Sequence, residues 1–106
     1  MNEEGAILSW DSWKKVKTFI SGAFAERGYD MSPLEWEPLE GVAGDSVRVT
    51  RGGYQYHVFL TCRYRNTFGF GISFVPTMKV IYNDSVPYDS DYKNTVVRVM
   101  DSLVTG

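Results

Sequence analysis

The sequence predicts an α+β fold: an N-terminal helix, a three- to four-stranded antiparallel meander sheet and a C-terminal helix. Apolar residues recur at helical spacing in one segment near each end of the chain. Between these segments apolar and polar residues alternate, as in strands with one buried face. The dipeptide Gly52-Gly53 separates two alternating runs, which favours a tight hairpin turn. We expect both helices to pack on one face of the sheet.

Size and composition narrow the class of protein. The chain has 106 residues, 43% hydrophobic and 15% aromatic, which fits a single domain over residues 1–106 with its own core. The single cysteine, Cys62, excludes an internal disulfide and a cysteine-rich zinc site, so we expect no metal and no cofactor. The acidic start lacks the pattern of a secretory signal, and no apolar run reaches the ~18 residues of a membrane span. These features favour a cytoplasmic protein without a membrane segment.

The first helix is predicted to begin after Ser9, a good N-cap, and to end at Arg27-Gly28. Leu8 and Trp13 flank this cap at the spacing of a hydrophobic staple. Residues at three- and four-residue spacing form the stripe that we expect to be buried: Trp13, Val16, Ile20, Ala23 and Phe24.

Residues 29–45 are the least regular part of the chain. Pro33 and Pro38 exclude a helix across this segment. Apolar and acidic residues alternate over residues 34–39, and an acidic edge bearing proline would discourage pairing with another chain. Two interpretations stay open, a short edge strand at 34–39 or an extended loop that wraps the sheet.

The central hairpin is predicted in register. A two-residue type I′ turn at Gly52-Gly53 pairs residue 51 with 54, 49 with 56 and 47 with 58. Neighbouring residues along a strand point to opposite faces, so this register separates an apolar face from a polar one. The apolar face carries Val47, Val49, Tyr56 and Val58, and the polar face carries Arg48, Thr50, Gln55 and His57.

The later elements follow from turn residues and periodicity. A three-residue loop, Arg65-Asn66-Thr67, is predicted to lead from the strand ending at Tyr64 to a strand over residues 68–74. A fourth strand is predicted over residues 78–82, and a turn over residues 83–85. The last helix is predicted to begin near Asp89 or Ser90 and to run to about Val104.

Charge is distributed unevenly along the chain, although the net charge is only −2. Residues 1–45 carry nine acids and four bases, and residues 84–106 carry four acids and two bases. Residues 46–83 carry five bases and no acid. The predicted sheet is therefore basic between two acidic flanks.

The candidate binding surface is the sheet face that the helices leave open. Its proposed binding residues are Arg48, His57, Phe59, Arg63 and Lys79. Gly69 and Gly71 lie at alternate positions of the same predicted face. Two explanations of this glycine pair stay open: Phe59 covers the bare backbone, or the flat strip admits a ligand or a partner.

Three functions are compatible with this surface. The preferred prediction is a small non-enzymatic binding protein with a protein partner, because arginine and aromatic residues anchor interfaces. In its short length and its lack of a catalytic set, the chain resembles the stand-alone inhibitor, immunity or accessory proteins of bacteria and phages. The first alternative is a single-stranded nucleic-acid-binding module, which the acidic flanks disfavour. The sixteen aromatic side chains also make a homodimer conceivable.

The second alternative is a small ribonuclease-like enzyme. His57 is the single histidine, and it would act with Arg63 and a carboxylate from residues 35–45. General acid–base catalysis needs a second positioned proton donor or acceptor, and the sequence identifies none. We therefore expect that the protein is not an enzyme.

Overall fold

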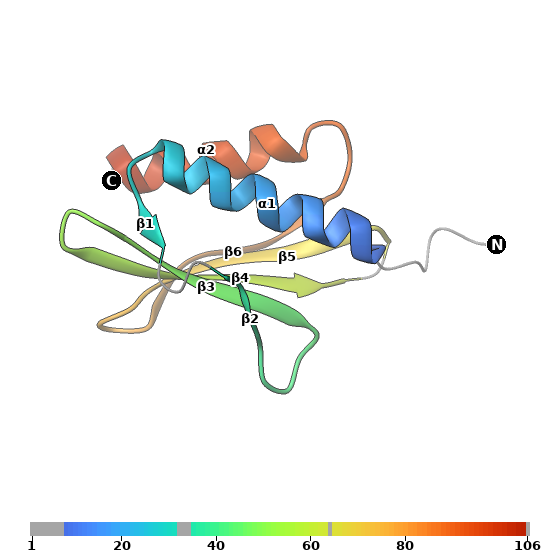
Figure 1. Ribbon diagram of the computed structural model, residues 1–106, viewed down its shortest axis with the longest axis horizontal. Helices are drawn as coiled ribbons and strands as arrows, with labels where there is room; N and C mark the ends of the chain where they lie inside the picture. Colours follow the sequence, from blue (N-terminus) through green and yellow to red (C-terminus); the bar gives the residue numbers. More distant parts are fainter. Residues whose placement is uncertain (1–7, 32–34, 64, 106) are drawn as a thin grey trace.

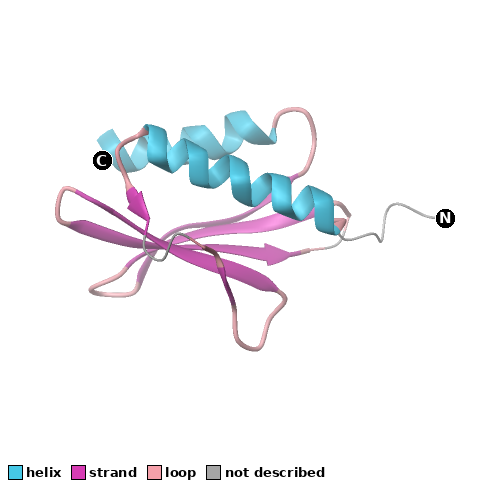
Figure 2. Ribbon diagram, viewed as in Figure 1, coloured by secondary structure: helices cyan, strands magenta, loops and turns pink. Residues whose placement is uncertain are grey.

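The two helices lie together over one face of an antiparallel sheet, as the computed structural model in Figure 1 shows. The structure describes residues 8–31, 35–63 and 65–105. Helix α1 spans Trp10–Glu26 and helix α2 spans Tyr92–Thr105. The sheet contains β1 (Asp30–Met31), β2 (Glu37–Pro38), β3 (Gly44–Arg51), β4 (Tyr54–Cys62), β5 (Thr67–Phe74) and β6 (Lys79–Pro87). Figure 2 shows the helical layer and the strand layer separately coloured. The predicted order of elements is confirmed, and the sheet has more strands than predicted.

The two additional strands explain the segment that the sequence left ambiguous. β1 and β2 each contain two residues, and both pair antiparallel with β3. Both short strands therefore lie along β3, and of the described residues 35–39 in the predicted edge strand only Glu37 and Pro38 are in strand conformation. Trp36 Nε1–H donates to Ser21 Oγ at 2.8 Å, which ties this segment to α1.

Helix α1 begins as predicted. Ser9 is the N-cap, and its Oγ accepts a hydrogen bond from the backbone N–H of Ser12 at 3.2 Å. Trp13 Nε1–H donates to Asp45 Oδ2 at 2.6 Å, and Lys17 Nζ lies 3.2 Å from the same oxygen. α1 is thereby fixed to β3 by a polar contact in addition to its buried stripe.

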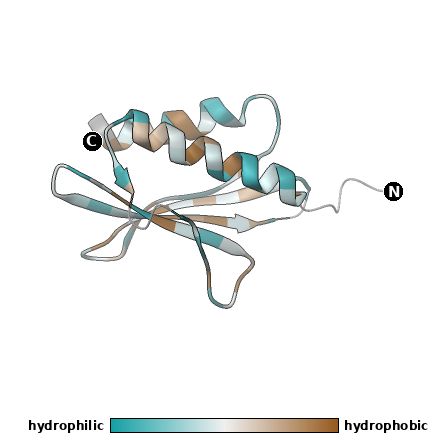
Figure 3. Cartoon of the chain, viewed as in Figure 1, coloured by the Kyte–Doolittle hydropathy of each residue, from teal (hydrophilic) through white to brown (hydrophobic). Residues whose placement is uncertain are grey.

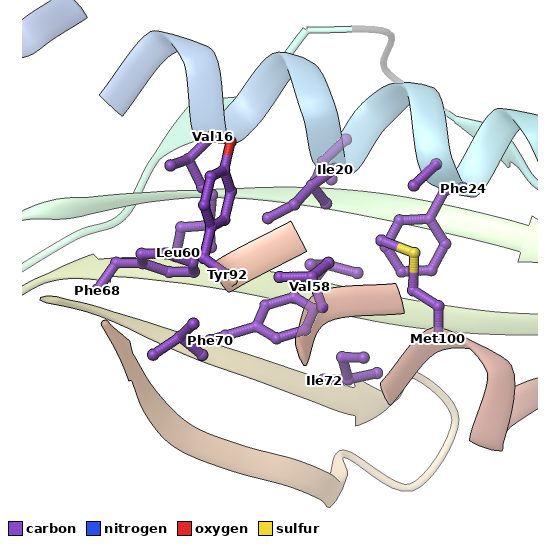
Figure 4. Packing of buried hydrophobic residues seen from close by; sticks show 14 of the residues in the cluster. Val16, Ile20, Phe24, Val58, Leu60, Phe68, Phe70, Ile72, Tyr92 and Met100 are labelled. Carbon is purple, nitrogen blue, oxygen red and sulfur yellow. The ribbon is translucent and has the colours of Figure 1, made fainter. Parts of the chain in front are cut away.

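The core lies between the helices and the sheet (Figure 4). Val16, Ile20 and Phe24 of α1 point toward the apolar face of β4 and β5, and all three are fully buried. Hydrophobic and hydrophilic stretches alternate along both helices in Figure 3, as expected for helices that bury one side. The sheet and α2 contribute Val58, Leu60, Phe68, Phe70, Ile72, Tyr92 and Met100.

The central hairpin has the predicted register. Arg51 pairs with Tyr54, Val49 with Tyr56 and Val47 with Val58. Gly52 and Gly53 have φ angles of 57° and 85°, and a type I′ turn requires positive φ at both positions.

The next connection is longer than predicted. The β4–β5 ladder ends at the pair Cys62–Phe68, so five residues, 63–67, lie between these paired residues instead of the three residues 65–67, and Thr67 pairs with Pro87 of β6. Arg65 and Asn66 both have positive φ, 62° and 56°, and this pair makes the turn. The odd length keeps each residue on its predicted face. Tyr64, the predicted end of the first strand, lies outside the described residues.

β6 (Lys79–Pro87) corrects the predicted turn at residues 83–85 and the predicted bounds of the fourth strand, 78–82. The predicted turn at residues 83–85 is strand, because these residues pair with Gly71, Phe70 and Gly69 at the sheet edge, where polar side chains remain in solvent. The register shifts between Ile72 and Ser73: Ile72 pairs with Tyr82 and Ser73 with Val80. Ile81 is therefore the extra residue of a β-bulge, and the two ends of β6 follow different registers.

Helix α2 begins at Tyr92, two or three residues after the predicted cap at Asp89 or Ser90. Asp89 Oδ1 accepts a hydrogen bond from the backbone N–H of Asp91 at 2.8 Å. This Asx-type turn occupies the position where the sequence predicts the helix cap. Arg27 joins the two helices, since its Nε–H lies 3.0 Å from Asp101 Oδ1.

Candidate functional site

The sheet face away from the helices, called the open face below, gathers most of the predicted binding residues. Arg48 pairs with His57, Phe59 with Gly71, and Thr61 with Gly69, so these side chains share one face. The core residues Val58 and Leu60 alternate with them and point to the opposite face. Within β3–β6 the open face carries these residues: Gly44, Ser46, Arg48, Thr50, Gln55, His57, Phe59, Thr61, Thr67, Gly69, Gly71, Ser73, Val80, Asn83, Ser85 and Pro87. None of them is a carboxylate, but Asp30 of β1 pairs with Thr50 and Glu37 of β2 pairs with Ser46 on the same face.

A hollow of about 330 Å³ lies in the middle of the open face, and it is called the open-face hollow below. Gly69 and Gly71 of β5 are among the residues that line it. Its lining is completed by Leu39, Val42, Phe59, Thr61, Arg63, Ser73, Val80, Tyr82 and Asn83. Volumes above about 300 Å³ are typical of sites for small molecules or for anchoring side chains.

The strand glycines make room for two side chains. A Cβ on Gly71 would stand 3.3 Å from Phe59 Cδ2, which is a tight contact. A Cβ on Gly69 would collide with Thr61 Oγ1 and would stand 2.7 Å from Arg63 Nε. Phe59 therefore covers Gly71, as one of the two explanations predicted, and Arg63 covers Gly69. The hollow above them also retains the space that the second explanation requires.

The loop between β2 and β3 forms one wall. It projects from the sheet on the side away from the helices (Figure 1). Leu39 N–H donates to Gly44 O at 3.0 Å, and Cys62 N–H donates to Ala43 O at 2.9 Å. These backbone bonds hold Leu39 and Val42 beside the hollow, and Val42 stays 58% exposed.

His57 and Arg48 lie next to the hollow. The His57 ring centroid is 4.5 Å from that of Phe59. Partial burial lowers the pKa of His57 below its usual 6.5, the cation of Arg48 lowers it further, and Glu37 opposes both. Near neutral pH the imidazole is therefore uncharged. A separate depression of about 410 Å³ is lined by Glu37, Pro38, Ser46, Arg48, His57, Val75 and Met78.

Arg63 forms no ion pair with any residue that the structure describes. The ion pairs found among the described residues are Lys17–Asp45 and Arg27–Asp101. Arg63 Nε–H donates to Thr61 Oγ1 at 3.4 Å. This contact and Gly69 orient the guanidinium against the lining of the hollow.

Lys79 is the predicted binding residue that does not join this site. Lys79 pairs with Phe74, which lies on the helix-covered face of the sheet. Lys79 lies on that face because the bulge at Ile81 reverses the alternation of side chains at the start of β6. The same bulge brings Val80 onto the open face and into the hollow. A bulge in an edge strand has no reliable sequence signal.

Sequence reasoning also missed Leu39, Val42 and Asn83. Leu39 and Val42 are apolar residues in a glycine-containing loop, which is a signal that could have suggested a binding wall. The sequence predicts a turn at Asn83, whereas Asn83 pairs with Gly71 in β6.

His57 shares its depression with one carboxylate, Glu37, which comes from the segment that the sequence proposed as its partner. Within residues 8–31, 35–63 and 65–105, His57 forms no ion pair with a carboxylate. In the same residues no group of three His, Cys, Asp or Glu side chains could hold a metal ion. Neither α1 nor α2, the helices of the described part, has the length and hydropathy needed to cross a membrane.

In comparisons with known proteins, no protein-family model, no curated protein and no solved structure matches this chain. Function is therefore inferred from the chemistry of the open face.

Proposed function

We propose that this protein binds an acidic segment of another protein through its open face. The observation that carries the proposal is the open-face hollow, in which Arg63 lies beside apolar walls and forms no ion pair with any described residue. Arginine and aromatic residues around a partly apolar depression are the usual anchors of protein interfaces. Asp30 of β1 and Glu37 of β2 lie on the same sheet face, but the described residues that line the hollow include Arg63 and no carboxylate, which favours a partner with negative charge at the hollow.

A protein partner accounts for the surface better than single-stranded nucleic acid does. Nucleic-acid platforms use several exposed aromatic rings along a basic groove. On the open face the one ring that lies in register beside the glycines is Phe59, and it is packed over Gly71 and against His57. Arg48 and Arg63 supply two permanent charges, which give little counterion release.

The first experiment compares two charge-matched double variants. Arg48→Glu with Arg63→Glu reverses two charges on the open face, whereas Lys14→Glu with Lys15→Glu reverses two on α1, and all four side chains are exposed. Immobilised wild-type protein is incubated with lysate of the native host. We expect the open-face variant to recover at least about tenfold less of the partner and the α1 variant to recover wild-type amounts.

Photo-crosslinking locates the partner independently of charge. A benzophenone amino acid at Val80, 57% exposed in the hollow, should attach the partner, and the same residue at Lys15 should not. Equal crosslinking from both positions, or captured material that nuclease removes, would contradict the proposal.

A further inference from the structure

The arrangement of Arg63 indicates which group of the partner enters the open-face hollow. Its Nε–H is occupied by Thr61 Oγ1 at 3.4 Å. Among the described residues, neither Nη group has a protein acceptor. A Cβ on Gly69 would stand 2.7 Å from Nε and 2.9 Å from Nη2, so the guanidinium lies against bare backbone. A planar donor held in this way is suited to a carboxylate, which accepts two parallel N–H bonds.

Apolar surface begins two residues along β5 from the guanidinium of Arg63. Phe59 stands over Gly71, two residues along β5 from the Gly69 position that Arg63 covers. Two strand residues span about 7 Å. Val42 and Val80 line the same hollow and are 58% and 57% exposed, so they present apolar area that a ligand would remove from water.

We infer that the hollow receives one carboxylate and one large apolar side chain of the partner, held about 7 Å apart on the same segment. This inference rests on the proposed function of the open face and specifies the chemistry of its occupant. The carboxylate pairs with the two Nη groups of Arg63, and the apolar side chain lies on Phe59 between Val42 and Val80. The apolar contact supplies affinity, and the arginine selects segments that carry an acid at this spacing.

A small molecule with the same two groups tests the inference without the partner. The probe is 3-phenylpropionate, which has a phenyl ring and a carboxylate at the ends of a short chain. Its neutral amide, 3-phenylpropionamide, keeps the shape and removes the charge, and acetate keeps the carboxylate without the ring. Each is titrated to about 20 mM into ¹⁵N-labelled protein, since ligands of this size bind with millimolar dissociation constants.

The expected result is a saturable shift of the Gly69 and Gly71 amide signals with 3-phenylpropionate. The amide and acetate should each bind at least about fivefold more weakly, because each lacks one of the two contacts. Arg63→Gln should bind the acid and the amide equally. Lys15→Gln, an equal charge change on α1, should keep the wild-type preference. The amide spectra themselves show that each variant is folded.

Two results would overturn the inference: no saturable shift at Gly69 and Gly71, or equal binding of acid and amide by the wild type. In that case, loss of the partner in the open-face charge variant would still support the proposed function. Conversely, a charge preference that depends on Arg63, with a partner that the open-face variant retains, would support the carboxylate site and refute partner binding through it.

Discussion

The ring of Phe59 lies across Gly71, its directly paired residue on the neighbouring strand, with Cδ2 3.3 Å from the place of a Gly71 Cβ. An aromatic ring over a strand glycine compensates for the missing side chain by covering the backbone. The contact belongs at once to the sheet and to the lining of the open-face hollow. Its energetic coupling can be measured.

A double-mutant cycle should detect this coupling. Gly71→Ala alone forces the Phe59 ring to shift, so we expect it to lower the free energy of unfolding. In a Phe59→Ala background the added methyl group meets no ring, and it should be neutral or stabilising because glycine weakens a strand. The expected coupling is about 0.5–1.5 kcal/mol, from urea unfolding of the four proteins. Additive effects of the two substitutions would show that the ring does not cover the glycine.

Gly44 should tolerate no side chain. A Cβ there would collide with the carbonyl oxygen of Leu60 and stand 3.0 Å from Thr61 Cα, and both are backbone atoms of β4. We expect Gly44→Ala to destabilise the protein by about 2 kcal/mol or more. Gly22→Ala is the matched control: nothing lies within 4 Å in the exposed middle of α1, so this change should stabilise by about 0.5–1 kcal/mol. A chemical denaturation series compares both variants with the wild type.

Asp45 should stabilise the folded protein mainly as the hydrogen-bond acceptor for the Trp13 indole N–H. Asp45→Ala leaves the indole N–H of a residue that is 8% exposed without its acceptor, and we expect a loss of about 1–3 kcal/mol. Asp45→Asn retains an acceptor oxygen and removes the ion pair with Lys17, which is worth less than about 1 kcal/mol at a part-buried site. Equal losses in the two variants would show that the ion pair dominates.

Stability should fall at mildly acidic pH because of His57. Burial first, and Arg48 second, lower its pKa in the folded protein below 6.5. As the pH falls, the unfolded chain therefore binds a proton at His57 before the folded protein does. The contribution of His57 to the free energy of unfolding is complete above pH 6.5, and it decreases below pH 6.5 until the pH has passed the folded pKa. We expect the urea midpoint of the wild type to decrease more than that of His57→Gln between about pH 7.5 and pH 5.5.

A direct titration checks the cause of this shift. In an NMR titration of the His57 ring protons, Arg48→Gln should raise the pKa toward 6.5 without restoring it fully, since burial is the larger cause. A wild-type pKa at or above 6.5 would contradict the whole account.

The open face was predictable wherever local rules and the hydrophobic pattern agree. Gly52-Gly53 requires a two-residue turn, and the alternation of Val47, Val49 and Val58 requires the same register. Arg48, His57, Phe59 and Arg63 therefore fall on the open face as predicted. Lys79 does not, because the bulge at Ile81 changes the alternation in an edge strand that pairs on one side only.

The sequence by itself determined the α+β class, the two helix positions, the central hairpin and the split between an apolar and a basic sheet face. These features depend on periodicity and turn chemistry, which act over a few residues. Tertiary structure alone decided that residues 37–38 pair with β3 and that residues 83–85 extend an edge strand. It also decided that Leu39 and Val42 line the open-face hollow. Pairing with a distant strand outweighed the weak local preferences of those residues, and only the folded chain brings such strands together.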